Sequence, residues 1–295
     1  MKSRRKFMQF GFGGAALAAV AHGQTLAAAS TALFRNHLAQ DLAMTSTDER
    51  RRDCPVVELR QYTLQPGTRE RFTALFEREF IESQEELGIT VIGQFSDLDD
   101  PNRFVWLRGF ADMAARGHAL PAFYTAPAPA WKAHREEANS MIVDSDNVLL
   151  LHAAKPQAQF ALSRLDRAAP GATENARGLL VATIYYLDAP ADAEFVDFFE
   201  RELAPTLAAS GIKPAAYFAS ESSANNFPRL PVRENEPVFA WFALYNDQGE
   251  YQRRTAALHE VRHWREAIAP TLRHRLKTPP QTLRLAPTPR SLLHV

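Results

Sequence analysis

The pattern of apolar positions predicts alternating strands and helices in the first part of the chain. Val56–Leu64 has the alternating apolar residues of a strand, and it is closed by the turn residues Pro66-Gly67. Apolar residues at helical spacing follow and predict a helix that begins at Thr68 or Arg69 and ends near Leu87. Two further strands, a helical region interrupted by prolines and a closing strand are predicted over Ile89–Phe95, Arg103–Phe110, Asp112–Ser140 and Asn147–His152.

A second copy of this pattern follows at a nearly constant offset. The helix sequence FTALFEREF at Phe72–Phe80 returns as FVDFFEREL at Phe195–Leu203. Further along, Phe104-Val105-Trp106 corresponds to Phe239-Ala240-Trp241, and the offset grows because the second copy has an insertion near Ala219–Glu236. We interpret this as a tandem repeat, because chance similarity does not keep aromatic and acidic positions in phase over such a length.

The element order predicts an α+β fold made of two ferredoxin-like repeats. Strand, helix, strand, strand, helix and strand form a split βαβ unit whose antiparallel sheet has helices on one face only. A second copy can cover the bare face, so we expect an intrachain pseudo-dimer, and a further homodimer is left open. The predicted segments are a signal peptide at 1–29, a leader at 30–54, repeat 1 at 55–152, a linker at 153–177, repeat 2 at 178–286 and a tail at 287–295.

The amino terminus resembles a twin-arginine (Tat) export signal. Ser3-Arg4-Arg5-Lys6-Phe7-Met8 matches the Tat pattern around the paired Arg4 and Arg5, and a short Gly/Ala-rich apolar stretch follows. The resemblance implies a bacterial protein that folds in the cytoplasm, engages the Tat export machinery and reaches the periplasm or is secreted. The apolar stretch is too short for a permanent membrane span.

Composition excludes several classes of protein. Lys+Arg and Asp+Glu are both 34, which argues against a dedicated nucleic-acid-binding protein. The single cysteine, Cys54, excludes an intrachain disulfide and any Cys-rich metal site, and we interpret it as a spare thiol. His259-Glu260-Val261-Arg262-His263 matches the HExxH zinc signature, but no Asp or Glu follows Glu266 as a third ligand. No metal site is predicted.

The opening of the first repeat resembles the NIPSNAP family. Glu58-Leu59-Arg60-Gln61-Tyr62-Thr63-Leu64-Gln65-Pro66-Gly67 follows that family's E-L-R-x-Y-x-L-x-P-G pattern, and Gly88-Ile89 and Pro129-Ala130-Trp131 match its order and spacing. The resemblance covers about 56–152. It implies a fold similar to the dimeric α/β barrels, which include cofactor-independent monooxygenases and some haem enzymes. NIPSNAP biochemistry is poorly defined, so no cofactor is predicted and a requirement for haem stays open.

Strand alternation sorts the first strand into two faces. We expect Val57 and Leu59 to pack on the helices, and Glu58, Arg60 and Tyr62 to point into the space between the two sheets. This polar set is either a ligand pocket, in which Arg60 holds a carboxylate or an enolate, or a structural network that sets strand register. The other predicted ligand-binding residues are Trp106, Arg108 and Tyr185, with simple core packing as the alternative for the aromatics.

The sequence does not identify the catalytic residues, if any. His118, before Pro121, and His134, one turn after Trp131, are candidates for a general base. The leading hypothesis is an exported NIPSNAP-domain protein that binds a small, largely apolar ligand between sheet and helices. A cofactor-independent monooxygenase-like enzyme and a structural or interaction module are the alternatives.

Overall fold

Two successive sets of strands and helices make up the part of the chain that the computed structural model describes, residues 53–125 and 129–295. The predicted signal peptide, with Arg4 and Arg5, lies outside these residues. The first half contains β1 (Val56–Leu64), α2 (Arg69–Glu79), α3 (Glu82–Glu85), β2 (Thr90–Asp97), β3 (Arg103–Phe110), α4 (Met113–Tyr124), α5 (Pro129–Met141), β4 (Ile142–Asp144) and β5 (Val148–Ala153).

The second half repeats this order after the short 3₁₀ turn η1 (Pro156–Ala158). It contains β6 (Leu179–Tyr186), α6 (Ala193–Phe198), η2 (Phe199–Leu203), α7 (Ala204–Ala209), β7 (Pro214–Ser220), β8 (Val238–Tyr245), α8 (Gln248–Glu260), η3 (Trp264–Ile268), α9 (Ala269–Arg275) and β9 (Gln281–Pro287). Pro205 lies in the first turn of α7, directly after the π-helical turn η2.

The strands form one antiparallel sheet that closes on itself. The first half has the order β2-β3-β1-β5 and the second the equivalent order β7-β8-β6-β9. The halves join edge to edge, because β2 pairs with β9 and β5 pairs with β7. With the β1–β3 pairing, every strand except β4 belongs to a closed barrel, and β4 pairs with the end of β1. The predicted α+β fold with antiparallel ferredoxin-like sheets is confirmed.

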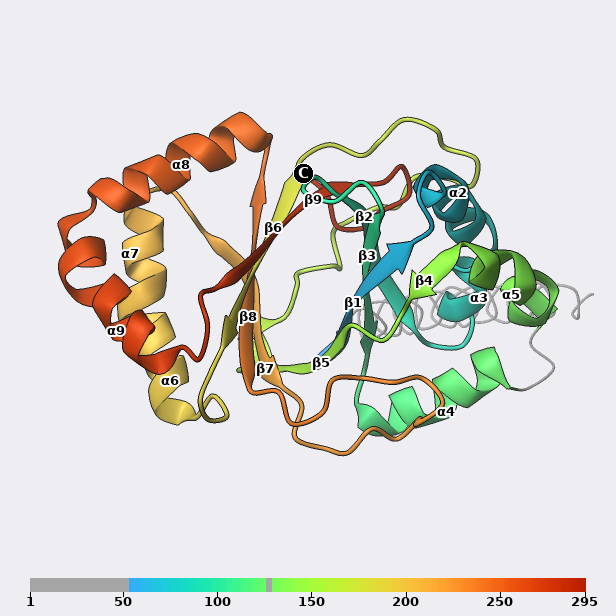
Figure 1. Ribbon diagram of the computed structural model, residues 1–295, viewed down its shortest axis with the longest axis horizontal. Helices are drawn as coiled ribbons and strands as arrows, with labels where there is room; N and C mark the ends of the chain where they lie inside the picture. The colour runs from blue at the N-terminus through green and yellow to red at the C-terminus, as the bar shows by residue number, and fades with distance from the viewer. Residues whose placement is uncertain (1–52, 126–128) are drawn as a thin grey trace, which may run out of the picture. The chain divides into compact units, whose positions relative to one another are not determined.

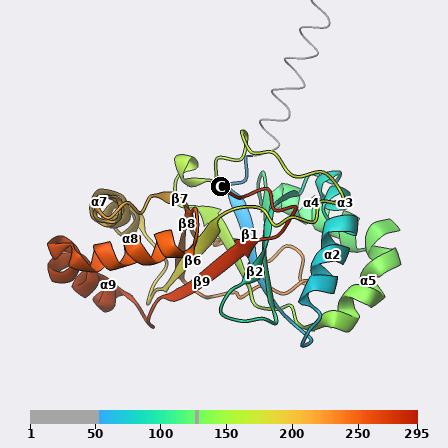
Figure 2. The same ribbon diagram turned by 90° about the horizontal axis from the view of Figure 1, so that it is seen from above.

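The helices of each half lie outside the barrel, on opposite sides of it (Figures 1 and 2). Helices α2 and α5 pack with β1 and β3 through an aromatic core that includes Phe72, Phe76 and Trp106. The helices of the second half pack on β6 and β8 around Phe199 and Trp241. No helix in the described part of the chain is long and apolar enough to cross a membrane.

The barrel interior is apolar, which reverses one of our expectations. Val57 and Leu59 belong to the interior core together with Leu107 and Leu180, whereas Tyr62 packs with the helices. The predicted orientation of the first strand was therefore wrong: its polar set faces the helices, not the second sheet. The sequence pattern could not show which face of β1 lies toward the helices, because both faces of this strand are buried and neither is exposed to solvent.

The predicted helix up to Leu87 is also interrupted. Helix α2 ends at Glu79, and the separate short helix α3 follows before Gly88, whose φ of 81° terminates the segment in the left-handed region. Gln84, on α3, is buried against the outer face of β3. Its side-chain oxygen accepts a hydrogen bond there from Arg108 Nη1 at 3.2 Å.

The insertion of the second half lies against the first half. This insertion, residues 221–237 between β7 and β8, runs toward α4 (Figure 1). Backbone hydrogen bonds join it to β5, from Glu221 N to Leu150 O at 2.9 Å and from Arg233 N to Val148 O at 2.8 Å. It therefore brings side chains of the second half to the outer face of the first.

Candidate functional site

A fully buried carboxylate on β1 is surrounded by three arginines. Glu58 Oε2 accepts hydrogen bonds from Arg60 Nη1 at 2.6 Å and from Arg108 Nε at 2.7 Å. Its other oxygen, Oε1, accepts from Arg116 Nε at 2.8 Å. All four side chains have no exposed surface. We call these four residues the arginine cluster.

The fold explains how the cluster assembles. In the antiparallel register Glu58 lies directly opposite Arg108, and Arg60 lies opposite Trp106. Helix α4 starts immediately after β3, because the Asp112 side chain caps it by accepting a hydrogen bond from Ala115 N at 2.6 Å. One turn into this helix, Arg116 reaches the same carboxylate.

The arginine cluster carries a net positive charge. Three guanidinium groups face one carboxylate, which leaves two positive charges in excess. Burial alone would raise the pKa of Glu58, but Arg108, Arg60 and Arg116 outweigh burial and hold this pKa well below its ordinary value. Arg60 Nη2 is buried and has no hydrogen-bond partner in the described part of the chain. Such a concentration of buried cations favours negative charge nearby.

Two tyrosines connect the arginine cluster to a cavity. The Tyr62 hydroxyl accepts a hydrogen bond from Arg60 Nε at 3.0 Å, and the Tyr124 hydroxyl accepts one from Arg108 Nη1 at 3.2 Å. Neither hydroxyl donates to a protein acceptor among the described residues, so the proton of each is available to a ligand. Burial raises the pKa of Tyr62 although Arg60 lowers it, which keeps the phenol protonated at neutral pH.

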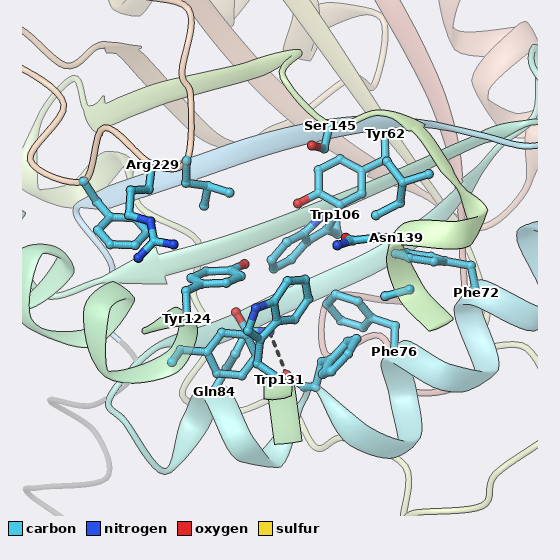
Figure 3. A pocket seen from close by; sticks show the side chains of 16 residues that line it. Tyr62, Phe72, Phe76, Gln84, Trp106, Tyr124, Trp131, Asn139, Ser145 and Arg229 are labelled. Carbon is cyan, nitrogen blue, oxygen red and sulfur yellow. Dashed lines mark hydrogen bonds between the residues drawn. The ribbon is translucent and has the colours of Figure 1, made fainter. Parts of the chain in front are cut away.

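The first cavity, of about 220 Å³, lies between the outer face of the barrel and the helices of the first half. Tyr62 and Tyr124 point their hydroxyl ends toward the same part of it, next to Trp106 (Figure 3). Its lining is mostly aromatic and comprises Tyr62, Phe72, Phe76, Phe80, Gln84, Trp106, Phe123, Tyr124, Trp131, Ala138, Asn139, Ile142, Ser145, Phe227, Arg229 and Leu230.

The insertion completes this cavity from the second half. Phe227 stacks on Tyr124 with ring centroids 6.0 Å apart, and the exposed Arg229 lines the mouth. The side-chain oxygens of Asn225 and Asn226 accept hydrogen bonds from Arg116 Nη1 at 3.0 and 2.5 Å. The insertion thus contacts both the cavity and the arginine cluster.

Four of the residues predicted from sequence come together here, and three do not. Arg60, Tyr62, Trp106 and Arg108 meet at the first cavity or directly behind it, whereas Tyr185 lies in the second half. The two candidate bases lie elsewhere: His118 is exposed on α4, and His134 contacts Glu79 at 3.2 Å; neither lines the cavity.

Sequence reasoning missed the residues that come from other elements. Arg116, Gln84 and Tyr124 lie on helices, and Asn225 lies on the insertion. A buried Glu with one Arg on its own strand and another on the neighbouring strand needs further polar partners, and this need would have directed attention to Arg116. Nothing in the sequence pattern indicated that the insertion crosses to the first half.

The second half has a cavity of its own in the equivalent place. This second cavity, of about 290 Å³, is lined by Tyr185 and Trp241 together with apolar and polar residues of α8, η3 and α9, among them Leu258, His259 and Arg273. Where the first half has Glu58 opposite Arg108, the second pairs Val181 with Ala243. Burial raises the pKa of Tyr185, and no arginine opposes this shift.

The residues of the first cavity do not form a metal or haem site. Helix α8 ends at Glu260, and Val261 is extended, so His259 and His263 do not lie on one continuous helix. Among the described residues no group of His, Cys, Asp or Glu is arranged to hold a metal ion. The first cavity offers no His, Cys or Met as an axial haem ligand, and arginines engage its tyrosine hydroxyls, so haem does not fit there.

Comparison with known proteins places the first half in a family. Residues 57–155 match the NIPSNAP family model, so this stretch is a NIPSNAP domain, as the resemblance implied. A NIPSNAP family protein from Agrobacterium tumefaciens is 24% identical and covers 34% of this chain and 93% of its own, with a TM-score of 0.31. No curated protein matches the chain.

Larger solved structures align with most of the chain. A candidate monooxygenase from Fusobacterium nucleatum covers 80% of this chain and 94% of its own at 12% identity, with a TM-score of 0.50. A chlorite dismutase variant from Candidatus Nitrospira defluvii covers 82% and 95% at 12% identity, with a TM-score of 0.43. At 12% identity the likeness to the candidate monooxygenase concerns the fold alone.

Proposed function

We propose that the NIPSNAP domain of this chain binds a small, largely apolar ligand in the first cavity. The observation that carries the proposal is an aromatic-lined cavity in which two tyrosine hydroxyls have protons free to donate. Ligand sites are typically concave, mostly apolar and supplied with a few convergent polar groups, which is the character of this lining. The volume of about 220 Å³ is below the roughly 300–1,000 Å³ of sites for drug-sized molecules, so the ligand is small.

Binding is better supported than the monooxygenase-like reaction. In that reaction a side chain would deprotonate a phenolic substrate that then reacts with oxygen. The residues that line the first cavity include no His, Asp or Glu, and Tyr62 is held in its protonated form. The candidate monooxygenase from Fusobacterium nucleatum supports this alternative through its fold only.

A purely structural module is also less well supported. A structural module needs neither the cavity nor the excess positive charge beside it. A buried cation without a partner costs stability, so a cluster that served only the fold would gain nothing from it. The second half shows that an uncharged set at the same positions builds the same strand pairing. The charged set therefore has a reason to exist beyond the fold, and a ligand supplies one.

We also propose that the chain is exported through the Tat pathway before it binds its ligand. The support is the sequence around Arg4 and Arg5. Replacing both with Lys should keep the full-length precursor in the cytoplasm. Normal amounts of mature protein in the periplasm from this double variant would contradict export by this route.

Extraction from the natural host tests the binding proposal. Protein purified from its own bacterium should carry a small molecule that mass spectrometry detects after denaturation. Asn139→Trp is the matched control, because Asn139 is exposed and its side chain lies at the cavity (Figure 3), so an indole there fills the opening. The wild type should release the molecule and the variant should not. Equal amounts from both would contradict binding in the first cavity.

A further inference from the structure

The polar groups of the first cavity that lie next to the arginine cluster offer free hydrogen-bond donors, whereas Asn139 and Ser145, which are less buried, carry acceptors as well. The Tyr62 and Tyr124 hydroxyls have free protons, and the buried Trp106 Nε1 has no partner among the described residues. The one buried amide, Gln84, is already engaged, since its oxygen accepts from Arg108 and its nitrogen donates to Phe80 O at 2.7 Å. A ligand in this cavity therefore meets donors that lack an acceptor.

The arginine cluster makes these donors selective for negative charge. Each tyrosine oxygen already accepts a hydrogen bond from an arginine, and this polarises its O–H bond toward the cavity. Two uncompensated positive charges lie directly behind the hydroxyls, in a site with little water to screen them. Together the donors and cations resemble the arrangement that stabilises an oxyanion.

The geometry favours an anion with its charge on one oxygen. A carboxylate is held best by the two parallel N–H groups of a guanidinium. Here Arg60 and Arg108 do not line the cavity, and the guanidinium of Arg229 lies exposed at its mouth. Beside the arginine cluster, the two tyrosines present one donor each (Figure 3). Two hydroxyls directed to the same region suit one phenolate or enolate oxygen.

We propose that the ligand of the first cavity carries a phenolic or enolic hydroxyl and binds as its anion between the Tyr62 and Tyr124 hydroxyls. This inference rests on the proposed function and names the class of ligand. The aromatic lining holds the apolar body of the ligand, and the exposed Arg229 at the mouth adds a positive charge along the entry path. The proton of the ligand leaves to solvent on binding, since no lining residue is a base.

The test uses 7-hydroxycoumarin, whose neutral and ionised forms absorb at different wavelengths. Bound to the full mature protein, its apparent pKa should fall by about one unit or more, a tenfold preference for the anion. 7-Methoxycoumarin, which cannot ionise, should bind at least tenfold more weakly at a pH where the hydroxyl probe ionises. Tyr124→Phe should remove most of the shift, and Tyr62→Phe should reduce it further in the double variant.

Matched controls separate this inference from its premise. Tyr185→Phe changes the equivalent tyrosine of the second half and should leave the shift unaltered, and thermal melts verify that each variant is folded. Equal binding of both coumarins without a shift would overturn the inference and leave the proposed function intact. Failure of both coumarins and of the neutral fluorophore N-phenyl-1-naphthylamine to bind would count against the proposed function itself.

Discussion

The two halves of the barrel have the same strand arrangement, but their equivalent positions carry different side chains. Both place a tyrosine on the first strand and a tryptophan on the third, in the same register, beneath a cavity of similar size. The first half surrounds this pair with Glu58, Arg60 and Arg108, whereas the second has Val181, Thr183 and Ala243 in their places. The comparison shows that the fold forms without these charged residues. Because burying charges costs stability, we infer that they are kept for recognition of a ligand.

The largest difference between the halves should appear when the carboxylate is neutralised. Glu58→Gln leaves three buried arginines without their counter-ion, which should lower the free energy of unfolding by about 3–5 kcal/mol. The matched change Val181→Thr adds one buried hydroxyl to the second half and should cost about 1–3 kcal/mol. Urea titrations measure both. Equal losses of unfolding free energy in the two variants would contradict the proposed difference between the halves.

The same carboxylate should make stability depend on acidity. Because the folded-state pKa of Glu58 lies below its ordinary value of 4.5, its contribution is complete above that pH and is lost as pH falls toward the lower folded-state value. The loss should approach about 1.4 kcal/mol per pH unit below pH 4.5. Urea titrations of the wild type and Glu58→Gln should therefore converge in acid. A constant gap between them would refute this linkage.

The insertion should have a smaller effect on stability. Asn226→Ala removes an acceptor of Arg116 and the hydrogen bond that Asn226 Nδ2 donates to Met113 O, so we expect a loss of about 1–2 kcal/mol. Release of 7-hydroxycoumarin should also become faster, because Phe227 beside it helps to close the cavity. Stopped-flow dissociation measures this. The neighbouring exposed Ser222→Ala is the control and should change neither quantity.

The smallest change in stability is expected at Arg60. Glu58 keeps Arg108 and Arg116 as partners in Arg60→Met, and the variant removes a cation whose Nη2 has no partner. We therefore expect a change of about 1 kcal/mol or less, together with loss of at least half of the coumarin pKa shift. A destabilisation as large as that of Glu58→Gln would show that Arg60 is primarily structural.

Much of the barrel could be predicted from local pattern. The strands Val56–Leu64 and Arg103–Phe110 were predicted to the residue, because turn residues bound them and their aromatic and branched side chains favour strands. The repeated helix sequence likewise anticipated equivalent strand order in both halves. The prediction of a candidate site at Arg60, Tyr62, Trp106 and Arg108 followed from their places on these strands.

The remainder depends on contacts that no local pattern encodes. The side of the sheet on which Glu58 lies was predicted wrongly, since both faces of β1 are buried. Tyr124 and Arg116 reach the site only because α4 folds back over β3, and Phe227 only because the insertion crosses between halves. Such long-range placement requires the tertiary structure.

The central claim is that the ligand binds in the first cavity, beside the arginine cluster, and not in the second cavity. Calorimetric titration with 7-hydroxycoumarin tests this claim most directly. Asn139→Trp blocks the first cavity, and Thr255→Trp, on α8, blocks the second. The wild type and Thr255→Trp should each bind one coumarin with equal affinity, while Asn139→Trp should bind at least tenfold more weakly. Loss of binding in Thr255→Trp with full binding in Asn139→Trp would contradict the account.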